Sequence, residues 1–216
     1  MFKNILFDLD GTLTDSFDGI ANAALYALKA LGETSYTKAD LNFFIGPPIF
    51  DSFDKIFNGD KQKVDSAVTL YREYFGDRGW RENRVYDGVR EMLQSLKDMG
   101  KIMAVATSKP EHFSRRITEY FDLDKYFVFV AGASLDESRA HKADVIKYAL
   151  ESTGMEKADT LMIGDRNHDI LGAKQCGLKS MGVLYGYGDR NEHLAAGADY
   201  IAETPEKIVE IFQNLK

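Results

Sequence analysis

Several features are scarce or missing in this chain of 216 residues. It has one cysteine, four prolines and no apolar run long enough to cross a membrane. A single cysteine excludes internal disulfides and thiolate zinc clusters, and it suits a reducing compartment. No basic segment followed by a long apolar core marks a secretory signal. We therefore expect a cytoplasmic protein that does not bind membranes.

Basic residues are fewer than acidic ones. The chain carries 27 Lys and Arg against 34 Asp and Glu, which gives a formal net charge of -7. An acidic chain gains little from a phosphate backbone, so we expect no nucleic-acid partner. An anionic substrate would have to be bound by a local cluster of cations and backbone N–H groups. The hydrophobic fraction of 44% is that of an ordinary globular protein.

Repeats and low-complexity linkers are also missing, and most of the chain alternates between strand and helix patterns. After a first apolar strand at residues 4–9, this alternation begins near residue 85 and continues to the C-terminal end. It predicts the α/β class, with a doubly wound parallel sheet and helices on both faces. The predicted strands are 102–107, 127–132, 160–165, 180–184 and 199–203. The predicted helices are one between Asp87 as N-cap and Gly100 as C-terminal cap, then 111–121, 142–152, 168–176 and a closing helix.

The segment before this alternation has two long helical patterns with no strand between them. We expect residues 1–15 and 85–216 to form the α/β core, and residues 16–84 to form an inserted, all-helical cap domain. Ligands of open parallel sheets bind outside the carboxyl ends of the strands. An insertion that leaves from the end of the first strand is therefore expected to act as a lid.

A Gly-Pro-Pro turn in FFIGPPIFDSF, residues 43–53, is the most distinctive stretch of the cap. It could present Ile45, Gly46 and Pro47 to a substrate and so set specificity. Equally, Pro48 at the first helical position would start a helix without any ligand. The sequence leaves both interpretations open.

Two acidic pairs follow apolar strands in opposite halves of the chain. Asp8 and Asp10 project to the same side as the first strand ends, and Gly11 allows the backbone to approach a ligand. Asp165 and Asp169 follow the strand at 160–165. One carboxylate could cap a turn or a helix. Four carboxylates at one edge of a parallel sheet would repel one another, which predicts a hard cation such as Mg²⁺.

Two other strand ends supply complementary groups. Thr107 and Ser108 offer hydroxyl and N–H groups to phosphate oxygens, or they simply start the following helix. Lys142 lies in the first turn of a helix, where the helix dipole disfavours a cation. It is therefore either a surface lysine or a lysine held near an anion. Arg139 is a second candidate for that cationic role, and Lys109 could contact substrate.

The ordered set of motifs resembles the haloacid dehalogenase-like (HAD) phosphohydrolase superfamily over nearly the whole chain. DLDGT is similar to its first motif, Thr107 to its second, Lys142 to its third and GDRNHD to its fourth. The segment IGPP resembles the phosphoglycolate phosphatase-like or 5′-nucleotidase-like branch. This resemblance implies a Rossmann-like core with a helical cap.

The resemblance also implies the catalytic roles. Asp8 would be the nucleophile that becomes an aspartyl phosphate, and Asp10 the general acid and base. Mg²⁺ would be held by Asp8, by the backbone carbonyl of Asp10 and by Asp165, with Asp169 as a direct ligand or a support. The implied phosphate-binding residues are Gly11, Thr107, Ser108 and Lys142, of which Thr107 and Lys142 are also counted as catalytic.

Together these residues predict a Mg²⁺-dependent phosphatase of small phosphate monoesters. The resemblance implies that these are phosphoglycolate-like compounds or nucleoside monophosphates. Enzymes accelerate phosphate-monoester hydrolysis by up to ~10²¹-fold, whereas one acid or base group contributes roughly 10²–10⁴-fold. A nucleophile, an acid, a metal and a cation are thus needed together. The alternatives are a phosphomutase, a pyrophosphatase, a metal-independent dehalogenase, a signalling receiver and a non-catalytic phosphate-binding protein. We expect a monomer or homodimer.

Overall fold

The computed structural model describes residues 2–135 and 138–215. The chain divides into two compact units, the first made of Met1–Thr14 and Val85–Lys216 and the second of Asp15–Arg84. Among the described residues, none of the helices combines the length and the apolar character needed to cross a bilayer. The cytoplasmic location stays a prediction.

The first unit is built on a six-stranded sheet in which all neighbouring strands are parallel, as predicted. The strand order is β5-β4-β1-β6-β7-β8. The short strand β1 is buried along its whole length between β4 and β6. The strands are β1 (Asn4–Phe7), β4 (Ile102–Pro110), β5 (Phe129–Ala133), β6 (Thr160–Gly164), β7 (Lys179–Val183) and β8 (Tyr200–Ala202).

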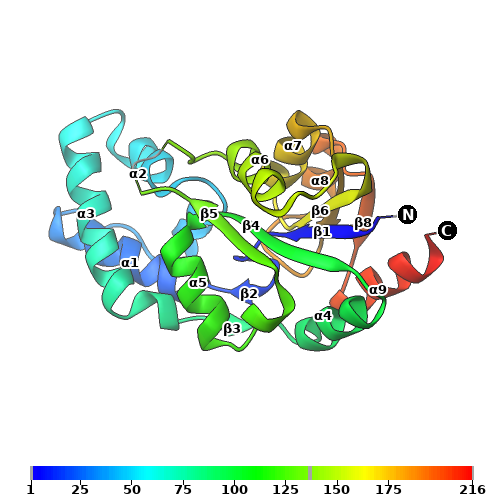
Figure 1. Ribbon diagram of the computed structural model, residues 1–216. Coiled ribbons are helices and arrows are strands. Elements are labelled where there is room, and N and C mark those ends of the chain that lie inside the picture. Colours follow the sequence, from blue (N-terminus) through cyan, green and yellow to red (C-terminus); the bar gives the residue numbers. More distant parts are fainter. Residues whose placement is uncertain (1, 136–137, 216) are drawn as a thin grey trace. The chain divides into compact units, whose positions relative to one another are not determined.

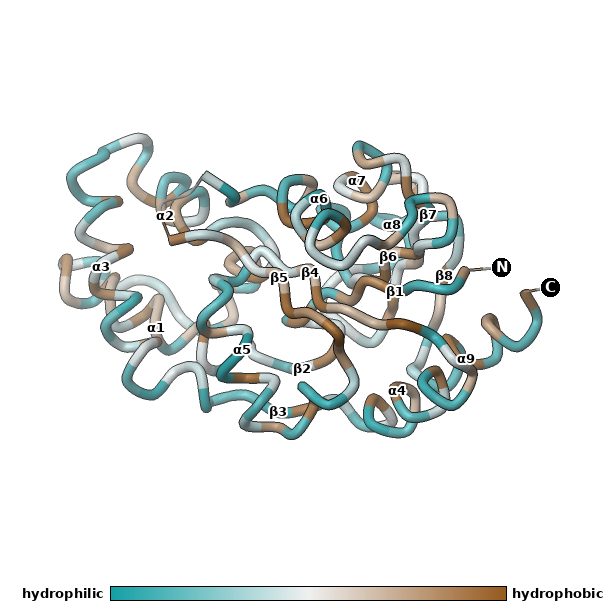
Figure 2. Tube along the Cα trace, in the orientation of Figure 1, coloured by the Kyte–Doolittle hydropathy of each residue, from teal (hydrophilic) through white to brown (hydrophobic). Residues whose placement is uncertain are grey.

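Helices cover both faces of this sheet, which confirms the doubly wound architecture (Figure 1). On one face lie α6 (Lys142–Thr153), α7 (Asn167–Cys176) and α8 (Arg190–Ala196), and on the other α4 (Val89–Asp98), α5 (Glu111–Tyr120) and α9 (Pro205–Asn214). Two short 3₁₀ helices, η3 (Asp124–Tyr126) and η4 (Lys157–Asp159), precede β5 and β6. The strands are the most hydrophobic part of the trace, and the polar residues lie mainly on helices and loops (Figure 2).

The core between the sheet and α6 explains why this helix forms at this place. Its apolar stripe includes Val145, Ile146 and Ala149, which pack against Leu6 and Met162 of the sheet. Burying an aliphatic side chain of this size stabilises the fold by about 1.5–3 kcal/mol. The stripe therefore fixes the rotation of α6, and with it the direction in which the first residue, Lys142, projects.

The second unit is helical, as predicted. An aromatic cluster holds it together, in which Phe53 contacts Phe44, Phe57 and Tyr71. Its elements are α1 (Phe17–Ala30), η1 (Lys38–Phe44), α2 (Ile49–Phe57), α3 (Lys61–Asp77) and η2 (Gly79–Arg81). The short strands β2 (Thr14–Asp15) and β3 (Arg84–Val85) pair where the chain passes between the units. There the Arg84 guanidinium donates to the Asp15 carboxylate at 2.8 Å.

Some local predictions were wrong. The strand predicted at 102–107 continues to Pro110, with a register shift against β5 between Ala106 and Pro110. The N-cap of α4 is Gly88, at a φ of 80°, and not Asp87, because the chain enters this helix through a left-handed turn. Helix α8 was not predicted because it spans only seven residues.

Candidate active site

The turn after β1 brings the first acidic pair to the carboxyl edge of the sheet. The backbone N–H of Asp8 still donates to the Ile163 carbonyl of β6 at 2.9 Å. The chain then turns at Gly11, whose φ is 83°. A Cβ at this position would overlap the carboxylate of Asp165. Glycine is therefore required here for two reasons, the left-handed backbone and the close approach.

The structure brings three of the four predicted metal-ligating carboxylates together. Asp8, Asp165 and Asp169 are buried, and one oxygen of each lies within 4.8 Å of the others. They come from the ends of the neighbouring strands β1 and β6 and from the first turn of α7. The side chain of Asp10 is not part of this carboxylate cluster.

Hydrogen bonds hold two members of the carboxylate cluster in place. The Asp165 carboxylate accepts from Thr12 Oγ1 at 3.2 Å and from the backbone N–H of Tyr187 at 2.9 Å. Asp169 accepts from the backbone N–H of Arg166 at 3.0 Å. The orientation of both groups is thus set by the protein, as a preformed ligand site requires.

Lys142 lies among these carboxylates and is buried, so its interpretation as a surface lysine is wrong. Its ammonium lies 2.7 Å from Oδ1 of Asp8 and 2.7 Å from Oδ1 of Asp169. It also donates to the Ala106 carbonyl at 3.1 Å. The helix-dipole argument from the sequence pointed to an anion nearby, and the partners are two buried carboxylates.

Burial and mutual repulsion perturb the protonation of the carboxylate cluster. Burial raises the pKa of Asp8 to about 6; the charge of Lys142 opposes this rise, and those of Asp169 and Asp10 add to it. Burial, followed by the charges of Asp169 and Asp8, also raises the pKa of Asp165 well above its usual value. Burial lowers the pKa of Lys142, but Asp169 and Asp8 outweigh it and the net shift is upward.

A divalent cation fits this arrangement. Three buried carboxylates face a single ammonium, so the fully ionised cluster has an excess of negative charge in a low-dielectric site. Carboxylate oxygens are the ligands of hard cations such as Mg²⁺. The donor set and its uncompensated charge therefore suit a metal ion.

Asp10 and the hydroxyl residues of β4 lie beside this cluster. The Asp10 carboxylate forms an ion pair with Lys109, with 2.6 Å between Oδ2 and Nζ. Thr107 is buried and Ser108 half-buried, and both belong to β4. The N-cap of α5 is Pro110, so the alternative that Thr107 or Ser108 starts this helix is wrong.

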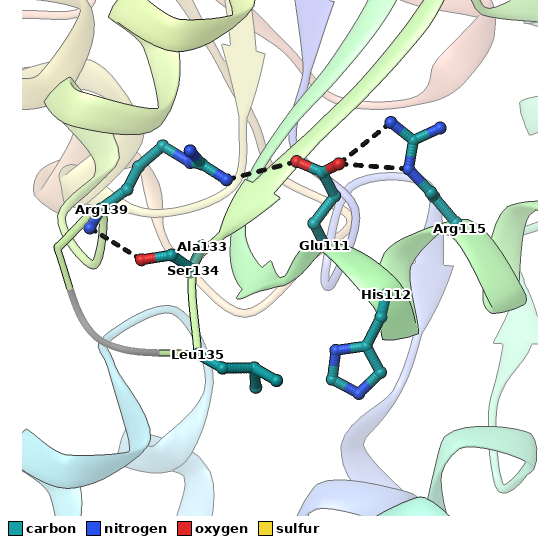
Figure 3. A pocket seen from close by; sticks show the side chains of 7 residues that line it. All are labelled: Glu111, His112, Arg115, Ala133, Ser134, Leu135 and Arg139. Carbon is teal, nitrogen blue, oxygen red and sulfur yellow. Dashed lines mark hydrogen bonds and ion pairs between the residues drawn. The ribbon is translucent and has the colours of Figure 1, made fainter.

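Arg139, the second candidate for the cationic role, contacts groups outside the carboxylate cluster. Its guanidinium donates to the Gly132 carbonyl at 2.9 Å and to Glu111 at 3.3 Å, and it stacks on the ring of Tyr148. Glu111 also binds Arg115 (Figure 3). These side chains line a surface hollow of about 530 Å³ at the ends of β4 and β5. Among the described residues, Lys142 is thus the cation that contacts Asp8.

Sequence reasoning missed Glu192 of α8, which braces the loop between β6 and α7. Its carboxylate accepts from Nε of Arg166 at 2.9 Å and from the backbone N–H of Asn167 at 2.7 Å. This loop joins Asp165 to Asp169. The capping pattern of α8, in which Asp189 accepts from the N–H of Glu192 at 2.8 Å, was the signal that could have revealed it.

The turn with Ile45, Gly46 and Pro47 lies in the second unit, between η1 and α2. Ile45 is buried and Gly46 has a φ of 104°. Pro48 is the N-cap of α2, which begins at Ile49. A role of these residues in substrate specificity stays a prediction.

Comparison with known proteins places these residues in a family context. The model of the haloacid dehalogenase-like hydrolases matches residues 5–183. A 5′-nucleotidase of Pseudomonas aeruginosa is 44% identical over 191 residues, which are 88% of this chain and 86% of that protein. Tyrosine-protein kinase PtkA of Mycobacterium tuberculosis is 36% identical, over 95% of this chain and 67% of its own length. The crystal structure of a predicted phosphatase from Clostridium acetobutylicum is 43% identical, covers all of both chains and has a TM-score of 0.96.

Proposed function

The chain belongs to the haloacid dehalogenase-like hydrolase family, and from this premise we propose that it is a Mg²⁺-dependent phosphatase of small phosphate monoesters. The observation that carries the proposal is the buried ion pair between Asp8 and Lys142 inside a carboxylate cluster that suits a metal. The relatives named 5′-nucleotidase and predicted phosphatase support phosphate esters as substrates.

In the first step, Asp8 is the nucleophile. A carboxylate oxygen of Asp8 forms a bond to phosphorus while the bond from phosphorus to the leaving oxygen breaks, and Asp10 gives its proton to that oxygen. With a pKa of about 6, Asp8 is mostly ionised at pH 7. Lys142, at 2.7 Å, orients it and offsets its charge.

In the second step, water replaces Asp8 at phosphorus. Asp10, now ionised, takes a proton from the water as its oxygen attacks, and the carboxylate of Asp8 is released. The phosphoryl oxygens are held by Lys142, Thr107, Ser108 and the backbone of Gly11. Asp8, Asp165 and the backbone carbonyl of Asp10 would hold Mg²⁺, with Asp169 as a further ligand or a support, and the ion would neutralise charge on the phosphoryl oxygens.

The phosphoryl acceptor separates this proposal from its rivals. A phosphatase passes the group to water, whereas a phosphomutase returns it to the substrate and a kinase passes it to another acceptor. The similarity to PtkA, a protein named as a tyrosine-protein kinase, makes this distinction necessary. Release of inorganic phosphate in proportion to substrate consumed supports the phosphatase.

For the leaving group we propose a chemical class and no single compound. Phosphoglycolate-like compounds and nucleoside monophosphates are the first candidates, and the 5′-nucleotidase relative favours the second. Sugar phosphates and pyrophosphate complete the set to be compared. A folded phosphoprotein should be a poor substrate, and its hydrolysis at the rate of a small ester would contradict the proposal.

The test is a screen of these compounds with Mg²⁺, with inorganic phosphate as the readout. EDTA should abolish every activity, and Asp8→Asn should reduce it by more than about 10³-fold, because the nucleophile is lost. Asp98→Asn on α4, an exposed aspartate, is the matched control and should be fully active. Full activity of Asp8→Asn would refute the proposal.

A further inference from the structure

The site contains a second buried lysine that the proposed reaction does not use. The side chains of Lys109 and Asp10 are exposed by only 5% and 12%, and their ion pair is 2.6 Å long. Lys142, by contrast, is placed against Asp8 and Asp169. The two lysines therefore contact different carboxylates, and the partner of Lys109 is the proposed general acid and base.

The backbone of Lys109 is held firmly on β4. Its N–H lies 3.3 Å from Oγ1 of Thr107, and its carbonyl accepts from Oγ of Ser114 at 3.4 Å. A Cβ on Gly132 of β5 would lie 2.7 Å from this carbonyl, so the close approach of β5 depends on a glycine. The backbone of Lys109 is thus fixed, and burial of the side chain together with the 2.6 Å ion pair to Asp10 sets the position of its ammonium.

The two oxygens of Asp10 have different environments. Oδ2 is bound by Lys109, whereas buried Oδ1 has no hydrogen-bond partner among the residues that the structure describes. A buried oxygen without a partner is costly and points to a missing one. The leaving oxygen of the substrate in the first step, and water in the second, are partners of the required kind.

We propose that Lys109 is a positioning residue that anchors Oδ2 of Asp10, so that Oδ1 is presented to the leaving oxygen and then to water. This inference rests on the proposed phosphatase function. Lys109 acts through Asp10 and exchanges no proton with the substrate. In the first step the proton moves from Oδ1 to the leaving oxygen, and in the second it returns from water to Oδ1.

The opposing explanation is that Lys109 binds the phosphoryl group directly. The two roles differ in their dependence on the leaving group. An alkoxide needs a proton when it leaves, whereas 4-nitrophenolate does not. Loss of a positioning residue should therefore slow the first step with phosphoglycolate much more than with 4-nitrophenyl phosphate, and loss of a phosphate ligand should slow both equally.

The experiment is a double-mutant cycle of Lys109→Met and Asp10→Asn. The rate of the first turnover of each substrate is measured by rapid mixing. With phosphoglycolate, Lys109→Met should be slower by about 10–10²-fold, part of the 10²–10⁴-fold that a general acid contributes. With 4-nitrophenyl phosphate, release of 4-nitrophenolate should change less than about threefold. In the Asp10→Asn background, Lys109→Met should cause no further loss, since residues that act as a unit are not additive.

Two further variants keep the test independent of folding. Lys109→Gln retains an N–H donor on a shorter side chain and should recover part of the rate with phosphoglycolate. Lys97→Met on α4 removes an exposed lysine and should behave as the unchanged protein. Binding of Mn²⁺ is measured by electron paramagnetic resonance. It should be as tight in Lys109→Met as in the unchanged protein, because the carboxylate cluster is intact.

Three outcomes would overturn the assignment. They are equal losses with the two substrates, an additive loss in the double variant, and a more than tenfold weaker binding of Mn²⁺ by Lys109→Met. Each would mean that Lys109 serves the phosphate or the metal. If the unchanged protein releases phosphate from none of the compounds in the screen, the proposed function fails; if the screen finds another alkyl ester instead, that ester replaces phosphoglycolate in the cycle. If it is active and the cycle is additive, only this inference fails.

Discussion

Replacing Lys142 with methionine removes the one ammonium that the structure places between Asp8 and Asp169. The variant keeps most of the side-chain volume but leaves two buried carboxylates without their cation and the Ala106 carbonyl without its donor. Removing one partner of a buried ion pair costs about 3–5 kcal/mol. At about 2–4 °C per kcal/mol, the melting temperature without metal should fall by about 6–20 °C.

The effect of Lys142→Met should shrink as the pH is lowered. Protonation of Asp8 relieves part of the unpaired negative charge, and the pKa of Asp8 is already about 6 with Lys142 present. With Lys142 present, protonating Asp8 costs about 2 kcal/mol at pH 7.5, at 1.36 kcal/mol per pH unit, and almost nothing at pH 5.5. In the variant the cost is lower at both pH values, because the charge of Lys142 no longer opposes the rise in the pKa of Asp8. The destabilisation should thus be largest at pH 7.5 and clearly smaller at pH 5.5.

The assay for Lys142→Met is urea unfolding in EDTA at both pH values, followed by far-UV circular dichroism. Fluorescence is less suitable, because the single tryptophan, Trp80, lies in the second unit. Lys147→Met is the matched control, since this lysine is exposed on the same helix. A loss below about 1 kcal/mol at pH 7.5, or equal losses at both pH values, would refute this account of the site.

Three further predictions concern the metal and its surroundings. The pKa values of Asp8 and Asp165 are raised, so these carboxyl groups must lose their protons before a cation binds. Mg²⁺ should therefore bind at least about tenfold more weakly at pH 5 than at pH 7.5. Equal affinities at the two pH values, measured by calorimetry, would contradict this prediction. Gly11→Ala should lower kcat by more than about 10²-fold and destabilise the fold by about 1–3 kcal/mol, because of the left-handed φ and the overlap of the new Cβ with Asp165. A fully active variant with an unchanged melting temperature would contradict this account of Gly11. Glu192→Gln should weaken Mn²⁺ binding by about 10–10²-fold, because Glu192 braces the loop between Asp165 and Asp169. Unchanged Mn²⁺ binding would show that the loop holds its shape without this carboxylate.

Much of the fold and most of the carboxylate cluster could be predicted from the sequence, because strand connectivity places particular ends together. Asp8 and Asp165 come directly after β1 and β6, which are parallel neighbours, so these two residues meet at one edge of the sheet. Asp169 follows within the first turn of α7 and cannot lie far away.

The pairing of Lys109 with Asp10 could not be predicted in this way. It depends on the continuation of β4 beyond Thr107 and on its irregular register against β5, and neither leaves a clear pattern in the sequence. The role of Glu192 depends on α8, a helix too short to give a helical period. Both are tertiary contacts between side chains that lie more than 20 positions apart in the chain.

The pairing of Asp15 with Arg84 has an evolutionary consequence. The second unit begins and ends at two residues, Asp15 and Arg84, that are hydrogen-bonded to each other. The first unit alone contributes Asp8, Lys142, Asp165 and Asp169. A loop of almost any length can join ends that are already adjacent, because the entropy of loop closure grows slowly with length. Insertions of different size and sequence can therefore be exchanged at this junction while the chemical groups are inherited unchanged.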